Sequence, residues 1–154
     1  MRFFHSGWRI GLVVLVLVLG CTPVQAGDPI EEAITYRQSA YKMIVWHVKP
    51  MTAMVKGKAD WDADAFNYHA KALAKLSRFP INGFIPGSDF GDTRAKEEIW
   101  ENWDDFQTKM NALIEQSQAL AKIAASDNQD AITEQFIKTA RTCKSCHKKY
   151  REKN

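Results

Sequence analysis

The sequence predicts an all-α protein, an antiparallel up-and-down four-helix bundle. Apolar residues recur every three or four positions in four long segments, and turn-forming residues separate these segments. No segment shows the period-two alternation that is typical of a half-buried strand. The first and last connections are short, which favours antiparallel neighbours. A chain of 154 residues suits one compact domain of this kind.

The first helix is predicted over residues 29–56. Asp28 is a suitable N-cap, Pro29 stands at the first helical position, and Gly57 ends the pattern. Pro50 lies inside the segment and is expected to kink or shorten the helix, because proline removes a backbone donor. The apolar stripe of this helix comprises Ile34, Tyr41, Ile44, Val48, Met51 and Val55.

Three further helices are predicted, over residues 62–79, 96–125 and 129–151. Pro80 stops the second helix, and residues 80–94 form the one long loop, which is rich in proline and glycine. The inner stripes are Phe66, Ala70, Leu73 and Leu76 in the second helix, Ile99, Trp103, Phe106, Met110, Leu113, Ser117 and Leu120 in the third, and Ile132, Phe136, Ala140, Cys143, His147 and Tyr150 in the last.

Residues 1–26 are expected to be a signal peptide, and residues 27–154 the folded domain. An apolar run of about ten residues follows two arginines; this is the length of a secretion signal and too short to cross a bilayer. Residues 24–26 form a small-x-small cleavage site, so export to the periplasm is predicted. The alternative is a lipoprotein signal that would leave Cys21 lipidated.

The composition argues against a nucleic-acid partner. The formal net charge is only +3, and the sequence holds no basic arm, Gly-rich phosphate loop or repeat. Once residues 1–26 are removed, the remaining cysteines are Cys143 and Cys146. In an exported protein an idle pair of thiols would tend to form a disulfide.

Cys143, Cys146 and His147 form a C-x-x-C-H pattern, which is typical of covalent haem c attachment. On a helix the two sulfurs lie three residues apart, close enough to reach the two vinyl groups on one edge of a porphyrin. His147 follows Cys143 by four residues and projects from the same face, where it can bind the iron. The sequence therefore predicts one haem c, bound through two thioethers, with His147 as the metal ligand.

Other interpretations of the cysteine pair fit less well. A structural zinc site needs four nitrogen or sulfur ligands, and the sequence holds no second cysteine pair. A thioredoxin-type pair belongs at the start of a helix after a strand, whereas this pair lies near the end of the last helix. A plain disulfide in a haem-free helical binding module is the remaining alternative.

The distal side of the iron is expected to face the first helix, because no Met or His follows His147. Arg37 shares the inward face with Tyr41, where its charge fits a pairing with a haem propionate; an arginine snorkelling from the bundle end is the alternative. Neutral Tyr41 is a poor iron ligand and is expected to cover the distal side. The residues expected to be packed or half-exposed, and not axial ligands, are Met43, His47 and His69.

The mature chain resembles the cytochrome c′ family, the class II c-type cytochromes, over nearly its whole length. The matching pieces are YRQSAY at residues 36–41, VKG at 55–57, FIPG at 84–87, EIW at 98–100 and CKSCHKKYR at 143–151. The resemblance implies a haem near the C-terminus of a four-helix bundle and a homodimer packed through the first helix. The residues it adds to the predicted haem site are Arg37 and Gln38 by the propionates, Tyr41 on the distal side, Phe84, and Arg151 beside the proximal histidine.

The resemblance further implies a five-coordinate, high-spin haem that binds nitric oxide or other small gases and can transfer electrons. Tyr41 is decisive, since low-spin relatives of the c556 type carry methionine at that position. The alternative is a dedicated electron carrier with a six-coordinate, low-spin haem. No enzyme is expected, although weak peroxidase-like activity stays open with Tyr41 as the one residue placed to move a proton.

Basic residues around the last helix could steer an acidic redox partner protein. The alternative is that they complement the dipole at the end of that helix and keep it soluble. These residues are Lys138, Arg141, Lys144, Lys148, Lys149, Arg151 and Lys153.

Overall fold

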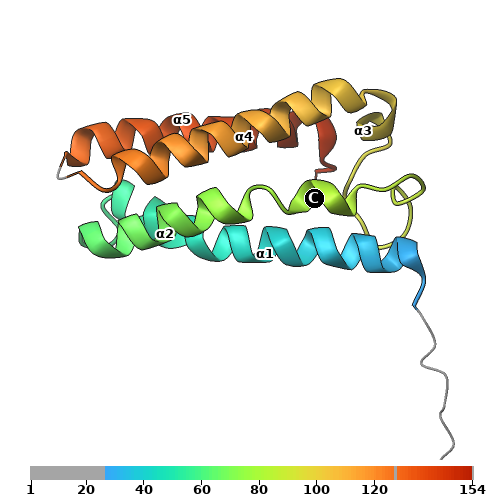
Figure 1. The fold of residues 1–154 in the computed structure, drawn as a ribbon, viewed down its shortest axis with the longest axis horizontal. Helices are drawn as coiled ribbons and strands as arrows, with labels where there is room; N and C mark the ends of the chain where they lie inside the picture. The colour runs from blue at the N-terminus through green and yellow to red at the C-terminus, as the bar shows by residue number, and fades with distance from the viewer. Residues whose placement is uncertain (1–26, 127, 154) are drawn as a thin grey trace, which may run out of the picture.

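A computed structural model describes residues 27–126 and 128–153 of the protein. These residues form a bundle of four long helices (Figure 1). The long helices are α1 (Pro29–Val55), α2 (Ala63–Leu76), α4 (Trp103–Ile123) and α5 (Gln129–Tyr150), and the short ones are η1 (Pro80–Gly83) and α3 (Glu98–Glu101). Over these residues the sole β-type pairing is an isolated bridge between Ala95 and Arg151. The predicted all-α, antiparallel up-and-down four-helix bundle is confirmed.

The long helices form two layers, α1 with α2 and α4 with α5, and contacts between α2 and α4 join the layers (Figure 1). The end of α5 lies at the same end of the bundle as the start of α1, η1 and α3 (Figure 1). The C-x-x-C-H segment therefore comes next to the long loop that joins α2 to α3.

The predicted signal peptide, its cleavage site and Cys21 lie outside the described residues. Of the helices that the structure does describe, none combines the length and the apolar character needed to cross a membrane.

Side chains cap the starts of three long helices, as their residue types indicate. Asp28 accepts a hydrogen bond from the Ile30 amide at 2.9 Å, and Asp62 accepts one from the Ala65 amide at 2.9 Å. Each bond satisfies a backbone donor that the first helical turn leaves without a partner. For α5 the cap is Asn128, which accepts from the Ala131 amide at 3.0 Å.

The predicted bounds need three corrections. Pro50 does not shorten α1, which continues to Val55. The chain turns at Gly57, whose φ of 63° suits glycine. α2 stops at Leu76, and the Ser77 hydroxyl donates to a carbonyl of the last turn. The third predicted helix is interrupted at Asn102, whose side-chain amide donates to the Glu98 carbonyl at 3.1 Å. Serine and asparagine side chains that bond nearby backbone compete with helix continuation.

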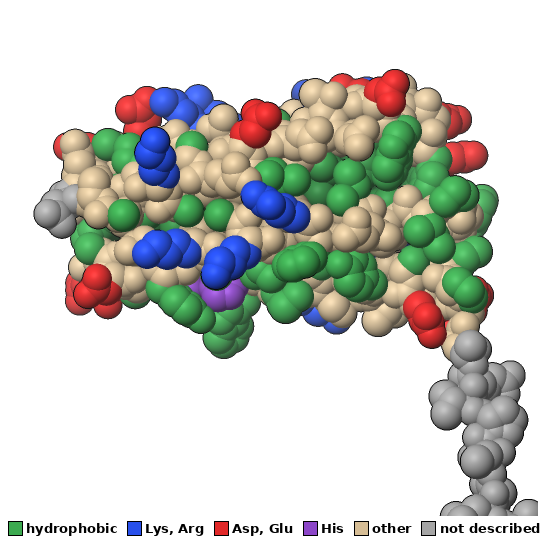
Figure 2. All heavy atoms as spheres, viewed as in Figure 1, with side chains coloured by type: hydrophobic (Ala, Val, Ile, Leu, Met, Phe, Trp, Pro, Cys, Tyr) green, Lys and Arg blue, Asp and Glu red, His purple; other side chains and the backbone are tan. Residues whose placement is uncertain are grey.

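Two apolar clusters fill the bundle, and Tyr41 of α1 packs against both of them. The larger cluster comprises Ile44, Met51, Phe66, Ala70, Leu73, Leu120, Ala124, Ile132 and Phe136. The smaller one, at the end where α5 finishes, comprises Phe84, Ile99, Phe106, Met110 and Tyr150. Figure 2 shows hydrophobic side chains gathered between the two layers toward this same end.

The inner stripe of α5 differs from the predicted one. Thr139 is buried, whereas Ala140 and His147 are exposed. The buried side chains Phe136, Thr139 and Tyr150 are spaced by three or more residues along one face, with the cysteines between them. Ala140 directly follows Thr139, and His147 directly follows Cys146. Both are therefore turned round the helix, to its solvent-facing edge.

Phe66→Ala should lower the free energy of unfolding by about 3–5 kcal/mol, because Phe66 is fully buried and the substitution leaves a cavity. Its ring stacks on Trp61 at 4.8 Å and meets Phe136 edge-on at 5.9 Å. Urea unfolding of the haem-loaded protein measures the change. Phe90→Ala is the matched control, since Phe90 is 73% exposed and should change stability by no more than about 0.5 kcal/mol. Equal effects of the two substitutions would contradict this assignment of the core.

Candidate haem-binding site

The C-x-x-C-H residues occupy the last turns of α5. Cys143 and Cys146 are free thiols and half-buried, while His147 is exposed. Cys146 packs against the smaller apolar cluster, and the Cys143 thiol contacts the Thr139 carbonyl at 3.9 Å. The two sulfurs thus border the apolar end of the bundle, and the imidazole lies at its edge.

Burial keeps both thiols protonated at neutral pH. It raises the pKa of Cys146 to about 11 and also raises the pKa of Cys143. The C-terminal end of a helix does not stabilise a thiolate, because the helix dipole carries a partial negative charge there. The pair therefore lacks the low pKa of a thioredoxin-type redox site.

The zinc interpretation gains no support from the structure. Over the described ranges, no three Cys, His, Asp or Glu side chains are grouped to hold a metal ion. A structural zinc site needs about four such ligands.

The surroundings of His147 favour its neutral form, which is the form that binds a metal. Partial desolvation lowers its pKa, and the charges of Arg151 and Arg94 lower it further. Arg151 follows directly on α5, where its amide donates to the His147 carbonyl at 3.3 Å. Arg151 therefore lies close to His147, and its role beside a haem ligand stays a prediction.

Tyr41 comes from α1 and meets the cysteines of α5 at the apolar end of the bundle. Its hydroxyl donates to Met110 Sδ at 3.7 Å. Burial raises the pKa of Tyr41, and the nearby Cys146 and Cys143 raise it further. These contacts hold a neutral phenol between the two apolar clusters and next to both thiols.

Arg37 lies one turn before Tyr41, and its guanidinium is buried against the loop between α2 and α3. Its two Nη atoms donate to Gly83 O at 2.8 Å, to both the hydroxyl and the carbonyl of Ser88, and to Thr93 Oγ1 at 2.8 Å. The guanidinium also stands over the Phe84 ring, 4.6 Å from its centre. Arg37 therefore fastens α1 to the loop and positions Phe84.

The charge of Arg37 has no carboxylate partner within 4.0 Å among the described residues. Its side chain is only 2% exposed, and burial lowers its pKa. The nearby charge of Asp89 raises the pKa of Arg37 again, and the hydrogen bonds to the loop compensate part of the cost of burying the guanidinium. The predicted neighbour Gln38 is also tied to the loop, since its amide donates to the Asp92 carbonyl at 2.6 Å.

Gly83 allows the close approach of η1 to α1. A Cβ atom at this position would lie 2.6 Å from the Ala33 carbonyl oxygen and 2.7 Å from Arg37 Cβ. A side chain would therefore push the loop away from Arg37 and break the hydrogen bond to the Gly83 carbonyl.

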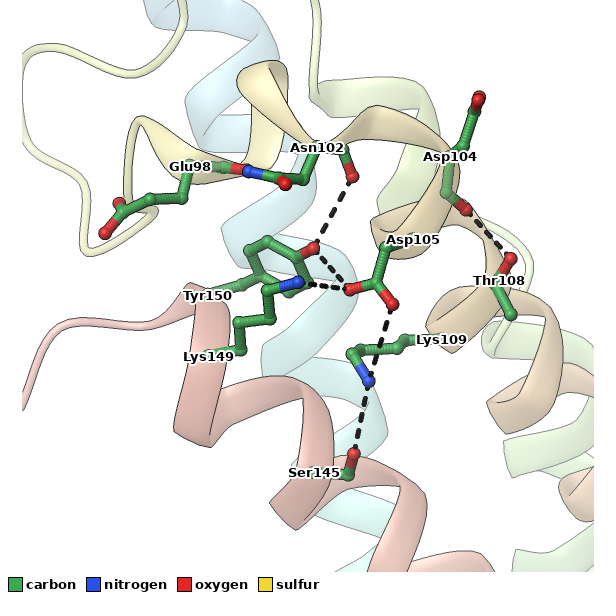
Figure 3. Close-up of polar contacts among 9 residues, drawn as sticks. All are labelled: Glu98, Asn102, Asp104, Asp105, Thr108, Lys109, Ser145, Lys149 and Tyr150. Carbon is green, nitrogen blue, oxygen red and sulfur yellow. Dashed lines mark hydrogen bonds and ion pairs between the residues drawn. The ribbon is translucent and has the colours of Figure 1, made fainter.

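A second set of contacts fixes the end of α5 to α4 (Figure 3). Asp105 Oδ2 accepts from Lys149 Nζ at 2.8 Å and from the Tyr150 hydroxyl. The Tyr150 hydroxyl also lies 3.5 Å from the carbonyl of Asn102, at the break between α3 and α4. Because Lys149 and Tyr150 come two and three residues after His147 on the same helix, these bonds set the position of the C-x-x-C-H turn.

Sequence reasoning missed the residues that hold the site in place. Ser88, Thr93, Asp105 and Asn102 are polar residues whose partners lie far away along the chain, and no local pattern marks them. Met110 was expected as a core residue only, and its contact with Tyr41 depends on how α1 and α4 pack.

The chemistry of these groups fits a haem c. Two protonated thiols and a neutral imidazole lie on one helix, an apolar cluster adjoins them, and a buried cation without a carboxylate partner lies on the facing helix. A porphyrin has an apolar ring, anionic propionates, and vinyl groups that react with thiols. Each feature thus has a complementary group at this end of the bundle.

Known proteins match both the sequence and the fold. Residues 32–151 match the family described as Cytochrome C′. A cytochrome c′ of Alcaligenes xylosoxydans is 35% identical over 123 residues, which cover 80% of this chain and 95% of the relative. The solved cytochrome c prime of Shewanella frigidimarina superposes with a TM-score of 0.80 and 41% identity over 83% of this chain and 99% of that one. The nitric oxide complex of a cytochrome c prime point mutant from Alcaligenes xylosoxidans gives a TM-score of 0.75 and 34% identity, over 84% of this chain and 100% of that one.

Arg37→Met should lower the free energy of unfolding by about 3–5 kcal/mol, since it leaves several buried acceptors without a donor. Arg78→Met removes an exposed arginine and should change stability by less than about 0.5 kcal/mol. Urea unfolding of both variants, followed by circular dichroism, gives the comparison. If Arg37→Met were as mild as its control, Arg37 would not be the anchor of the loop.

Proposed function

Because the chain belongs to the cytochrome c′ family, which implies a c-type haem, we propose that it is a periplasmic haem protein that binds nitric oxide or another small gas and exchanges single electrons. The observation that carries this proposal is the position of Tyr41, a tyrosine and not a methionine, opposite the two thiols of α5. When bound, the haem supplies an iron centre for gas binding and one-electron exchange.

In this proposal one haem is attached through thioethers to Cys143 and Cys146, and His147 binds the iron. The half-buried thiols support attachment, since Cys146 packs against the apolar cluster that would receive the ring and Cys143 lies one helical turn before it. Arg37 and Gln38 would face the propionates, Arg151 would lie beside His147, and Phe84 would contact the ring. Arg37 forms no direct ion pair within 4.0 Å among the described residues, and its buried positive charge supports a role toward an anion.

Tyr41 would cover the distal side without binding the iron, so the iron stays five-coordinate and high-spin. Its ring is wedged between two apolar clusters, and its hydroxyl is engaged with Met110. A bulky, apolar cover admits a small diatomic molecule more readily than a large ligand. The similar cytochrome c prime mutant from Alcaligenes xylosoxidans was solved as a nitric oxide complex, which supports this gas as the ligand.

The alternative is a dedicated electron carrier with a six-coordinate, low-spin haem of the c556 type. It would need a strong sixth ligand, and the thioether of Met110, 3.7 Å from the Tyr41 hydroxyl, is the candidate. Steering of an acidic partner by the basic residues of α5 gains little support, because Lys149 is paired with Asp105 and Lys138 with Glu134. We therefore favour gas binding, with no enzymatic turnover.

The exposed face of α1 supports the proposed homodimer. Tyr36, Met43, Val45 and Trp46 are large apolar residues of this helix that reach solvent, and Trp46 is 73% exposed. Apolar groups that gather on one exposed helix often mark a protein interface.

Spectra of the haem-loaded protein test the proposal. The reduced protein should give a high-spin spectrum that changes on addition of nitric oxide. Tyr41→Met should shift the spectrum toward low spin, because a thioether would then face the iron. Tyr36→Met places the same side chain on the solvent-exposed part of α1 and should leave the spectrum unchanged.

A low-spin spectrum of the unmodified protein would support the electron carrier instead. Haem that can be extracted with acidified acetone from the denatured protein would refute the thioether attachment.

Trp46→Glu should convert the dimer into a monomer, because it places a charge in the apolar contact. Light scattering coupled to size-exclusion chromatography measures the mass. Phe90→Glu is the control, since Phe90 is equally exposed but lies in the loop and not on α1. A monomeric unmodified protein at micromolar concentration would contradict association through α1.

A further inference from the structure

Two histidines outside the C-x-x-C-H segment meet on the surface formed by α1 and α2. His47 belongs to α1 and His69 to α2, and their Nδ1 atoms are 2.9 Å apart. The described residues hold one further histidine, His147 of the haem site. Twenty-two positions separate His47 from His69, so the helix pairing brings them together.

The two rings meet through their Nδ1 atoms and are tilted against each other. Their centroids lie 5.2 Å apart at an interplanar angle of 58°, and the Tyr68 ring flanks both of them. Both histidines are half-buried, so their outer atoms remain within reach of solvent. Figure 2 shows histidine atoms at the surface over the α1–α2 layer, beside hydrophobic and Lys or Arg side chains.

We propose that His47 and His69 form a surface site for a divalent transition-metal ion, Zn²⁺ or Cu²⁺, bound through the two Nδ1 atoms. Imidazole nitrogens bind zinc at about 2.0–2.1 Å. When two such nitrogens bind the same ion, the nitrogen–metal–nitrogen angle lies between the square-planar and the tetrahedral value. The two nitrogens are then about 2.9–3.3 Å apart. The observed Nδ1–Nδ1 distance of 2.9 Å lies at the short end of this range, so the rings must turn, without moving closer together, for both lone pairs to face one ion.

Without a metal the pair shares one hydrogen, with one Nδ1 as donor and the other as acceptor. Burial lowers the pKa of His69, and the charge of His47 lowers it further, which favours the neutral form of His69. To bind an ion, the donor ring moves its hydrogen from Nδ1 to Nε2, and both Nδ1 lone pairs then point at the metal. The site therefore takes up the ion without net release of a proton.

The ligand set selects the kind of ion. No third Cys, His, Asp or Glu joins the two rings in the described part of the chain, so water would complete the coordination. Calcium and magnesium prefer oxygen ligands, above all carboxylates, and would bind poorly here. Imidazole suits zinc and copper, and copper binds the more tightly of the two.

This site is separate from the haem site, because it lies between α1 and α2 while the C-x-x-C-H turn belongs to α5. In the haem-loaded protein, the thiols and His147 are engaged by the haem under the function proposed above. Metal binding by that form would therefore report on His47 and His69, and its failure would leave the haem proposal untouched.

Calorimetric titration of the haem-loaded protein with Zn²⁺ tests the inference. We expect one ion per chain and a rise of the melting temperature on binding. His47→Gln and His69→Gln should each weaken binding at least about tenfold and abolish that rise. Lys71→Gln, at an exposed position of α2, should bind zinc as the unmodified protein does. Mg²⁺ should give no heat of binding.

Cu²⁺ provides a second readout, since its electron paramagnetic resonance spectrum should show hyperfine coupling to two nitrogens. An unchanged haem absorption spectrum in each glutamine variant establishes that it is folded. If the unmodified protein takes up neither ion, or if both variants bind as tightly as it does, the pair is a hydrogen-bonded contact between helices and the inference is wrong.

Discussion

The burial of Arg37 is the constraint on which the apolar end of the bundle depends. A guanidinium that is withdrawn from water must be surrounded by acceptors, and four hydrogen bonds to Gly83, Ser88 and Thr93 supply them. These bonds draw a loop of irregular backbone against α1, and the loop carries Phe84 with it. Gly83 is required at the contact, because any side chain there would collide with α1. One buried charge thus organises a segment that has little regular structure of its own.

The end of α5 is fixed in a different way. α4 begins only after the break at Asn102, and the carbonyl at this break faces the Tyr150 hydroxyl. Asp105, in the first turn of α4, accepts from Lys149 and from Tyr150 (Figure 3). The ring of Tyr150 is buried and meets Phe106 edge-on, so apolar packing and polar contacts act on the same residue. The C-x-x-C-H turn is therefore held from its C-terminal side, while Arg37 holds the facing surface.

Local features of this fold could be predicted from the sequence, and contacts between distant residues could not. The caps Asp28 and Asp62 can be recognised because each is an aspartate just before a segment with helical apolar spacing. The C-x-x-C-H motif can be recognised from the spacing of its residues. The break at Asn102 escaped prediction because the apolar stripe runs through it without interruption. Arg37 was rightly expected on the inward face, yet its serine and threonine acceptors lie more than fifty residues away. His47 and His69 were expected to be packed or half-exposed, and both are half-buried, but only the pairing of α1 with α2 reveals that they meet.

The position of Tyr41 explains why binding is favoured over catalysis in the proposed function. A distal residue that takes part in proton transfer needs a hydroxyl that is free to reorient toward a bound ligand. The Tyr41 hydroxyl instead donates to Met110 Sδ, and its ring is packed on two sides by separate apolar clusters. Arg37, one turn earlier, anchors the same stretch of α1 to the loop, so the helix cannot easily shift to release the ring. In the proposed function Tyr41 would therefore act by its volume, discriminating between ligands by size and offering them no proton.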